Sequence, residues 1–562
     1  MIGTRNKTFF SPFGWIAWIA AALCLLPMVA VLVAAFSGGA ETVASLISSV
    51  LPRYLGTTLL MVVIVALGTA VIGTGAAWLV TMTRFPGRKL FEIALALPLA
   101  FPAYVLAYAY TDFLDHPGLV QTTLRDLTGW GPRDYWFPEI RSLGGAAAML
   151  TLVLYPYVYL LARAAFLQQS ATAYIAARTL GHGPFSAFWS VSLPIARPAI
   201  AGGMLLATME TIADFGTVSY FGVQTFATGI YQSWFSFADR AAAAQLALCL
   251  LAFALILASL EHAQRKSKRH HGAGRRFEEM EPARLKGLHA FGAMLFCGLP
   301  VALGFLLPAI LLITMGWGSS QILLSSRYID FFQNSLTLAV IAALLTVLAA
   351  VSLGFNARLK RSNASKAAVR VAGLGYAVPG GVIAVGLIVP FAAFDNAVDA
   401  VMEAHFGIDT GLLITGSIWL LIMAYIVRFM AAALSAYDAG LATINPNMDA
   451  VARTLGRSPP AMLRGVHLPI LKPSLLTALL IVFVDVMKEL PATLIMRPFN
   501  FDTLAVQAHR LASDERLAEA AVPSLVIGAV GLLPVALLCW GMGRKESSAR
   551  GFVPEPDAAR SP

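Results

Sequence analysis

Charged residues are scarce in this chain. Of its 562 residues only 12% are Asp, Glu, Lys or Arg, whereas 58% are hydrophobic and the mean hydropathy is +0.73. A soluble globule of this length needs far more polar surface to face water. The composition therefore excludes a soluble protein and predicts an integral membrane protein.

Cysteine is rarer still, and nucleotide-binding sequences are absent. The four cysteines, Cys24, Cys249, Cys297 and Cys539, stand inside apolar segments without the spacing of metal ligands, so we predict core packing and no fixed metal site. The chain contains no G-x-x-x-x-G-K-[ST] sequence, and therefore no phosphate-binding loop of its own. We predict that it binds no cofactor.

The apolar segments exceed the roughly 20 residues that cross a bilayer as a helix. Their composition does not resemble the short alternating strands of an outer-membrane barrel. We therefore predict an all-α integral membrane fold with about twelve transmembrane helices. These begin near Phe13, Leu55, Leu90, Gly144, Pro198, Ala243, Leu288, Phe332, Ala367, Leu412, Pro473 and Val522.

The chain repeats itself at a nearly constant spacing. Ala-Ala-Arg-Thr-Leu-Gly at 176–181 recurs as Val-Ala-Arg-Thr-Leu-Gly at 451–456, 275 residues later, and Leu-Pro-Ile follows both copies at the same distance. Earlier in each half the offset is 277, as between Pro102 and Pro379. An even number of spans per half predicts two tandem six-helix repeats, related by a pseudo-two-fold axis along the membrane normal.

These patterns predict the boundaries of the domains. We place the first transmembrane repeat at 1–262, a basic cytoplasmic linker at 263–287, the second repeat at 288–545 and a disordered cytoplasmic tail at 546–562. Lys and Arg cluster near the N-terminus, after alternate spans and in the run 265–269, so the positive-inside rule makes both termini and both repeated loops cytoplasmic. The net charge of +10 is explained in this way, and we predict no nucleic-acid partner.

Each repeated loop has a glycine at a helix end and an amphipathic stretch after it. Gly181 and Gly456 suit the left-handed conformation of a helix C-terminus, and Pro184 and Pro459 can begin the next helix. An interfacial helix that rests on lipid would explain one such loop, but two copies with identical spacing favour docking of a shared partner. The apolar face is aromatic in copy one and aliphatic in copy two: Phe185, Phe188 and Trp189; Met462, Leu463 and Val466.

The spacing Ala-Ala-x-x-x-Gly, nine residues, an aliphatic residue, one residue and Leu-Pro resembles the EAA loop of MetI-like ABC importer permeases. The resemblance implies a coupling helix that docks on a cytoplasmic ATPase. The Glu of the family pattern is missing, since Ile175 and Ala450 stand in its place and Asp449 comes one position early. The family motif falls on Ala176, Ala177, Gly181, Val191, Leu193 and Pro194, and again on Val451, Ala452, Gly456, Val466, Leu468 and Pro469.

Four carboxylates lie in the spans that follow the two loops. Glu210 matches Asp485 and Asp214 matches Glu489 at the 275 offset, and each pair is four residues apart, which predicts one helical face. A buried carboxylate costs at least ~2.5 kcal/mol, so we predict that all four face a polar translocation pathway between the repeats, suited to a positively charged or metal-bearing cargo. Lys488 could instead neutralise its neighbours and hold helices together, but copy one has no matching lysine and so no obvious local cation.

The segments 209–231 and 488–507 are similar to the fused permeases of ferric-iron importers. The resemblance implies a non-enzymatic permease of the bacterial inner membrane that moves ferric ion by alternating access. Its implied partners are two copies of a cytoplasmic ATPase, which would hold ATP and Mg²⁺, and a periplasmic or lipid-anchored iron-binding protein. Fused permeases for thiamine or another small cationic solute share the layout. An ion-coupled secondary transporter without an ATPase is the alternative from a different class.

Overall fold

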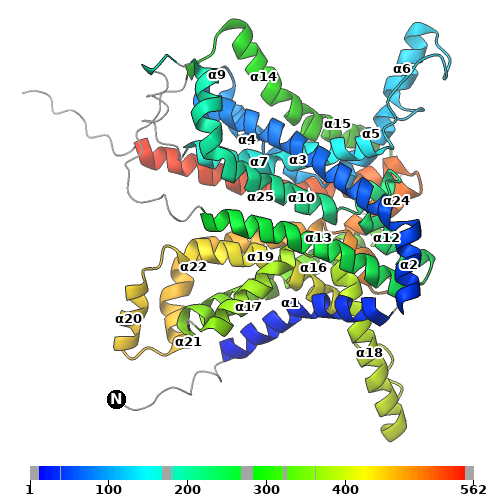
Figure 1. Cartoon of the computed structure of the whole chain (residues 1–562), viewed down its shortest axis with the longest axis vertical. Coiled ribbons are helices and arrows are strands. Elements are labelled where there is room, and N and C mark those ends of the chain that lie inside the picture. The colour runs from blue at the N-terminus through cyan, green and yellow to red at the C-terminus, as the bar shows by residue number, and fades with distance from the viewer. Residues whose placement is uncertain are drawn as a thin grey trace, which may run out of the picture.

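Long helices that run roughly side by side make up the computed structural model of this chain (Figure 1). The structure describes residues 12–37, 39–167, 179–181, 183–267, 283–319, 326–360 and 362–550. The predicted cytoplasmic tail and most of the predicted linker fall outside these ranges or at their edge. The predicted boundaries between the domains stay predictions.

The first repeat contains the following elements: α1 (Pro12–Ser37), α2 (Gly39–Ser49), α3 (Leu51–Met82), β1 (Thr83–Arg84), α4 (Arg88–Ala94), η1 (Leu97–Ala100), α5 (Ala103–Leu114), α6 (Leu119–Thr128), α7 (Leu143–Leu167), α9 (Pro184–Ala187), η2 (Phe188–Ser192), α10 (Leu193–Ala213), α11 (Gly216–Tyr220), α12 (Phe226–Tyr231), η3 (Gln232–Ser236) and α13 (Arg240–Ser267).

The rest of the chain, from the end of the predicted linker through the second repeat, contains β2 (Ala283–Arg284), α14 (Gly287–Val301), η5 (Ala302–Leu306), α15 (Leu307–Trp317), α16 (Ser326–Lys360), α17 (Asn363–Gly373), η6 (Leu374–Ala377), α18 (Gly380–Phe406), α19 (Ile418–Leu441), α20 (Pro446–Thr454), α21 (Pro459–Met462), η7 (Leu463–His467), α22 (Leu468–Met487), α23 (Pro491–Met496), α24 (Leu504–Ser513) and α25 (Leu517–Arg550).

The number of spans agrees with the prediction. Within the described ranges, eleven helices are long and apolar enough to cross a membrane, and the pair Arg88–Ala100 and Ala103–Thr128, bent by 91°, makes a twelfth if it counts as one span. The span expected near Leu90 is this bent pair, which begins at Arg88. One predicted start needs correction: the span expected near Ala367 begins at Gly380, because α17 is a separate amphipathic helix.

The two repeats share their irregular features as well as their helices. The short turns η1 and η6 begin 277 residues apart, and a proline follows each of them as the residue before a new helix, Pro102 before α5 and Pro379 before α18. Both prolines have extended backbone, with ψ of 150° and 148°. Because proline has no backbone N–H to donate within a helix, the helical structure is interrupted at the same place in each copy.

The repeats are interlocked rather than side by side. Helix α1 of the first repeat packs on α16, α17 and α18 of the second, while α14 and α15 of the second pack on α3, α4 and α5 of the first. The approach is close: a Cβ added to Gly386 of α18 would lie 2.4 Å from the carbonyl oxygen of Pro27 in α1. Glycine at this position lets two backbones meet.

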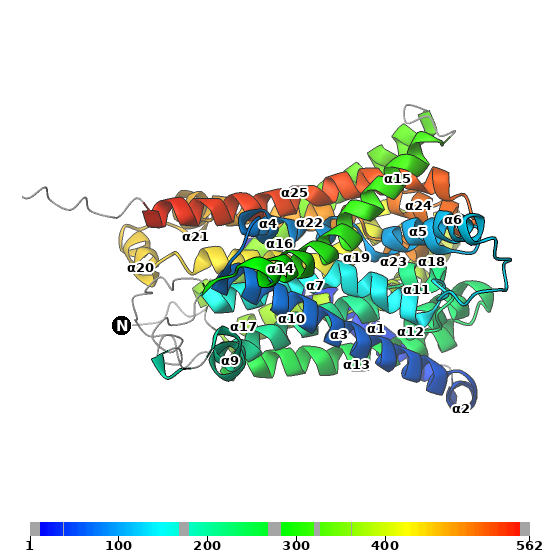
Figure 2. The same ribbon diagram turned by 90° about the horizontal axis from the view of Figure 1, so that it is seen from above.

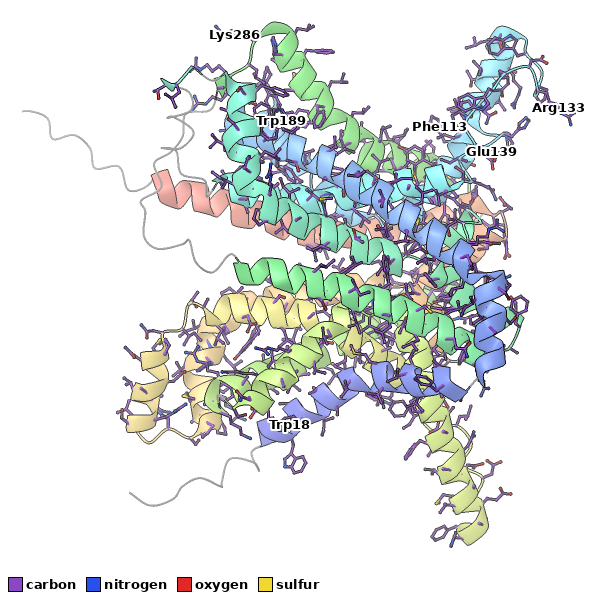
Figure 3. The ribbon with its side chains drawn as sticks, viewed as in Figure 1. Trp18, Phe113, Arg133, Glu139, Trp189 and Lys286 are labelled. Atoms are coloured by element: carbon purple, nitrogen blue, oxygen red, sulfur yellow. The ribbon has the colours of Figure 1, made fainter. Side chains whose placement is uncertain are left out.

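Both repeated loops lie at one end of the bundle, which we call the loop end. Figures 1 and 2 show α9, α20 and α21 together at this end, whereas α2, α6 and α18 lie at the opposite, far end. In Figure 3, Trp189 lies at the loop end, and Arg133 and Glu139 lie at the far end. The repeats therefore enter the bundle the same way up, as an even number of spans requires. Strand β1, at the end of α3, pairs in parallel with β2, just before α14, so the end of the predicted linker is fixed to the first repeat.

Candidate functional site

A charged cavity lies between the two repeats. All four predicted carboxylates, Glu210, Asp214, Asp485 and Glu489, line it, and it holds about 1030 Å³ of space without atoms, its open side included. Its walls come from η1, α5, α7 and α10 of the first repeat and from α19 and α22 of the second. The structure thus brings the four side chains to one central place, as predicted. Their role in transport stays a prediction.

The carboxylates do not share one continuous helical face, and this part of the prediction was wrong. Helix α10 ends at Ala213, and Asp214 already has extended backbone, with φ of −67° and ψ of 130°. Helix α22 ends at Met487, so Glu489 also lies beyond its helix. Each pair therefore has a helix end between its two members, and the two helix ends fall within one residue of matching positions in the repeats.

Asp214 and Glu489 cap the short helices that follow the breaks. Asp214 accepts hydrogen bonds from Thr217 N at 3.1 Å, Thr217 Oγ1 at 3.0 Å and Val218 N at 3.2 Å, at the start of α11. Glu489 accepts from Ala492 N at 2.8 Å, and from Thr493 N at 3.0 Å and Thr493 Oγ1 at 2.5 Å, at the start of α23. A carboxylate at a helix N-terminus satisfies amides that have no partner within the helix. These two side chains therefore hold the broken backbone in place.

Glu210 and Asp485 form the second matched pair, and a lysine serves both. Lys488 Nζ lies 2.9 Å from Asp485 Oδ1, and these two side chains are 28% and 26% exposed. The ammonium group also interacts electrostatically with Glu210 from the other repeat. Copy one has no matching lysine, as the sequence shows, but for Glu210 the lysine of copy two supplies a cation across the boundary between the repeats.

Arg428 of α19 is a cavity residue that sequence reasoning missed. Its Nη1 atom lies 3.5 Å from Glu489 Oε1, and the guanidinium lies 5.8 Å from the centre of the Phe429 ring. A single arginine within an otherwise apolar span was the signal that could have identified it, since such residues face protein or a polar cavity. At the 275 offset the first repeat has Val153 in its place, and Ala213 in place of Lys488. Both cavity cations thus come from the second repeat.

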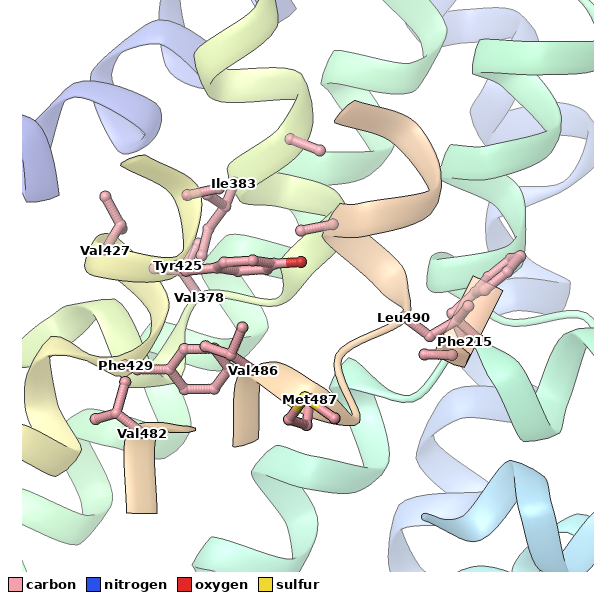
Figure 4. Packing of buried hydrophobic residues seen from close by; sticks show 14 of the residues in the cluster. Phe215, Val378, Ile383, Tyr425, Val427, Phe429, Val482, Val486, Met487 and Leu490 are labelled. Carbon is pink, nitrogen blue, oxygen red and sulfur yellow. The ribbon is translucent and has the colours of Figure 1, made fainter. Parts of the chain in front are cut away.

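Apolar and aromatic side chains surround these charges. Figure 4 shows Phe215 and Leu490, which follow Asp214 and Glu489 in their own repeats, lying close together, and both residues line the cavity. The Phe215 ring stacks on Tyr231, with 3.7 Å between ring centres. Tyr104 donates a hydrogen bond to the carbonyl oxygen of Lys488 at 3.3 Å. Within the described residues, no three His, Cys, Asp or Glu side chains are grouped to hold a metal ion.

An ion pair joins the two repeats at the far end. Arg141, just before α7, donates to both carboxylate oxygens of Glu515, just before α25, at 2.7 and 2.9 Å, and to Asp115 Oδ2 at 3.0 Å. The hydrogen bonds from Arg141 lower the pKa of Glu515. The guanidinium also lies 5.2 Å from the centre of the Tyr220 ring. We call this contact the far-end bridge.

The first repeated loop is described only from Thr179 onward, so Ala176 and Ala177 lie outside the described residues. Gly181 has φ of +87°, which confirms the left-handed conformation expected of it. Phe188 is buried against Trp78, with 4.9 Å between ring centres, whereas Phe185 and Trp189 are 64% and 57% exposed. The aromatic face is therefore partly turned outward. Val191 is half-buried, and Leu193 and Pro194, also half-buried, form the first residues of α10.

The second loop is described in full. Gly456 has φ of +70°, as expected, and Pro459 begins α21. The expected partner-facing residues differ, because Met462 and Leu463 are buried in the core and Val466 is half-buried. The exposed apolar surface belongs instead to α20 and the turn after it. Val451 is 55% exposed and Leu455 74%, while Ala452 is buried. Leu468 and Pro469 begin α22, half-buried and exposed respectively.

Asp449 holds this second loop to the bundle. It is buried, and its two carboxylate oxygens accept from Arg358 Nε of α16 at 2.5 Å and from His467 Nε2 of η7 at 2.8 Å. Burial raises the pKa of Asp449, but the hydrogen bonds from Arg358 and His467 outweigh it and hold the pKa below the ordinary value of 3.8. An acid one position before the expected Glu thus makes a buried contact of its own. At the 275 offset, Tyr174 and Ser192 stand in place of Asp449 and His467.

Comparison with known proteins identifies the family. The family model described as "Binding-protein-dependent transport system inner membrane component" matches residues 69–270 and 348–539, one match in each repeat and together well over half of the chain. The chain belongs to this family. Membership makes it a multi-pass permease subunit of the inner membrane, and implies an ATPase and a binding protein as partners.

Individual relatives of this permease match over most of its length. The Fe(3+)-transport system permease protein FbpB 2 of Haemophilus influenzae is 27% identical over 525 residues, covering 92% of this chain and 95% of the relative. A probable ABC transporter permease protein, y4fN of Sinorhizobium fredii, is 24% identical and covers 87% of this chain and 88% of its own length. The ferric transport system permease protein FbpB of Actinobacillus pleuropneumoniae is 25% identical, covering 74% of this chain and 61% of the relative.

Proposed function

We propose that this permease carries ferric iron, delivered by a periplasmic or lipid-anchored binding protein, across the bacterial inner membrane. The observation that carries the proposal is the cavity between the repeats, where four carboxylates face two basic side chains. A small, highly charged cation prefers hard oxygen ligands of this kind. The names of two relatives, both ferric-iron permeases and one of them matched over 95% of its length, support the same cargo.

Two copies of a cytoplasmic ATPase would drive the movement, one at each repeated loop, and would hold the ATP and Mg²⁺. The two loops lie at the same end of the bundle, which supports a pair of similar partners there. Helix α1 begins at that end and α25 finishes at it, and Lys286 lies there too (Figure 3). We assign the loop end, and with it both termini, to the cytoplasm on the positive-inside rule.

Alternating access follows from the placement of the cavity. A force that moves the two loops together acts on α10 and α22, since the loops continue directly into these helices at Leu193 and Leu468. Both helices end at the cavity carboxylates. A movement of the loops therefore reaches the cavity within one rigid element on each side, and the caps at Asp214 and Glu489 keep the breaks ordered while the repeats shift.

Uptake of radioactive iron tests the proposal. Cells that lack this chain and have no duplicate system should lose uptake, and the wild-type gene should restore it. We expect Glu210→Gln and Asp214→Asn to reduce uptake because each removes a negative charge from the cavity, while asparagine can still cap the helix that follows. Glu403→Gln, an exposed carboxylate of α18 outside the cavity, is the matched control and should have no effect. Normal iron uptake in the deletion strain would refute the assigned cargo.

A further inference from the structure

Two of the four cavity carboxylates, Asp485 and Glu210, share Lys488 as a cation, whereas Glu489 lies 3.5 Å from Arg428. Asp214 and Glu489 are engaged by backbone amides and threonine hydroxyls that belong to the fold. Asp485 is paired with the ammonium of Lys488 at 2.9 Å, and the same ammonium interacts with Glu210. A cation that enters the cavity must therefore compete with the Lys488 ammonium for Asp485.

The backbone of Lys488 is held while its ammonium is not fixed by the fold. Lys488 follows the last residue of α22, and its carbonyl oxygen accepts a hydrogen bond from Tyr104 at 3.3 Å. Its side chain is 28% exposed and lies in the wall of the cavity. Four methylene groups let a lysine ammonium swing away without any movement of the backbone.

The helix break does not need a lysine. In the first repeat Ala213 stands at the matching position as the last residue of α10, and the capping aspartate follows it directly. The lysine is therefore an addition to the shared fold. It places one positive charge in a cavity lined by both members of the matched pair, Glu210 and Asp485.

We propose that Lys488 is a tethered counter-ion that occupies the place of the cargo in the empty cavity. This inference rests on the proposed function, in that a cation passes through. An entering cation displaces the ammonium from Asp485 and Glu210, and the ammonium returns as the cation leaves. Conduction requires sites that release their ion. The Lys488 ammonium competes for the two carboxylates and so keeps them from binding a highly charged cation too tightly to release it.

Binding of a trivalent probe to the purified permease–ATPase complex tests this directly. Tb³⁺ luminescence, in lipid nanodiscs and without the binding protein, reports on a hard cation that seeks oxygen ligands. We expect Lys488→Met to bind Tb³⁺ at least about tenfold more tightly than wild type, because a unit charge has been removed within a few ångströms of the site. Lys488→Arg should behave like wild type. Lys472→Met, in the helix α22 that precedes Lys488 but outside this cavity, is the matched control.

A second substitution separates the counter-ion from a structural role. Adding Asp485→Asn to Lys488→Met should abolish the gain in Tb³⁺ affinity. If the methionine variant changed Tb³⁺ affinity only by disturbing the fold, the second substitution would not restore the wild-type affinity. Lys488→Gln repeats the test if the methionine variant does not assemble. In transport, the tighter site should release iron more slowly, so Lys488→Met should lower the maximal rate of uptake.

The outcomes distinguish this inference from the proposed function. If correctly assembled Lys488→Met binds Tb³⁺ no more tightly than wild type, or more weakly, the counter-ion role is wrong. If the wild-type complex fails to restore iron uptake, the assigned cargo is wrong, and the comparison of Tb³⁺ affinities still decides whether Lys488 competes with a cation.

Discussion

Replacing Asp449 by alanine should release the second repeated loop from the bundle. The carboxylate joins three elements, since it is itself in α20 and accepts hydrogen bonds from Arg358 of α16 and His467 of η7. Without it, Arg358 keeps its hydrogen bond to the carbonyl oxygen of Ile444 at 3.0 Å but loses its only ion-pair partner among the described residues. The loop should then open more often while the spans stay folded.

The size of the effect follows from burial. The ion-paired side chains of Arg358 and Asp449 are only 13% and 9% exposed. Removing one partner of a buried pair costs about 3–5 kcal/mol, because the other charge is left without compensation. The remaining bond to Ile444 puts the expected cost near the lower figure, about 3 kcal/mol, which is on the order of a hundredfold in the opening equilibrium.

Hydrogen exchange of the α20 amides measures this opening. Asp449→Ala should lose about a hundredfold of protection in α20 and little in α19, and ATP hydrolysis stimulated by the binding protein should fall with it. The double variant with Arg358→Met should recover part of the loss, because no buried charge remains. Asp438→Ala, an exposed aspartate of α19, is the control. Wild-type protection of α20 in Asp449→Ala would refute the reasoning.

The pH dependence of this clamp has a definite sign. The pKa of Asp449 lies below its ordinary value of 3.8, so its contribution to the stability of the loop is complete above that value and is lost as pH falls through the lowered pKa. At neutral pH the clamp is therefore fully formed. Protection of α20 should stay constant from pH 7 down to about pH 5 once intrinsic exchange rates are corrected for.

Two further predictions concern the far-end bridge and the loop glycines. Arg141→Gln removes the bonds to Glu515 and Asp115. Since Glu515 is exposed and Arg141 and Asp115 are only half-buried, the cost should stay below about 1 kcal/mol, and basal ATP hydrolysis without the binding protein should rise less than about fivefold. The pKa of Glu515 is lowered, so the bridge weakens only as pH falls below the ordinary value of 4.5, where the wild type should approach the variant. Gly181→Ala and Gly456→Ala strain a left-handed backbone by about 1–2 kcal/mol each, and less ATPase should copurify with the chain.

Each of these predictions has a control within the chain. Arg133→Gln changes an exposed arginine of the same far-end loop and should leave basal hydrolysis unchanged. Gly183→Ala and Gly465→Ala lie in the same two loops, with open space around them and no left-handed backbone. If these alanines release the ATPase as strongly as those at Gly181 and Gly456, backbone strain is not the cause.

Sequence alone was sufficient for features that depend on local pattern. Apolar length predicted the spans, and the 275 offset predicted two copies that lie the same way up. The left-handed glycines at 181 and 456 followed from their place after small-residue helices. The free-energy cost of burying a carboxylate in a membrane predicted that Glu210 and Asp485 line a shared polar cavity, because few other places in a membrane protein can hold them.

Only the tertiary structure decided which side chains these carboxylates face. Arg428 comes from α19, Lys488 interacts with a carboxylate of the other repeat, and the helix breaks turn Asp214 and Glu489 into caps. The crossing of α1 onto the second repeat is of the same kind. Such contacts join residues far apart in the chain, and their energies depend on distance and burial in three dimensions, which no periodicity in the sequence records.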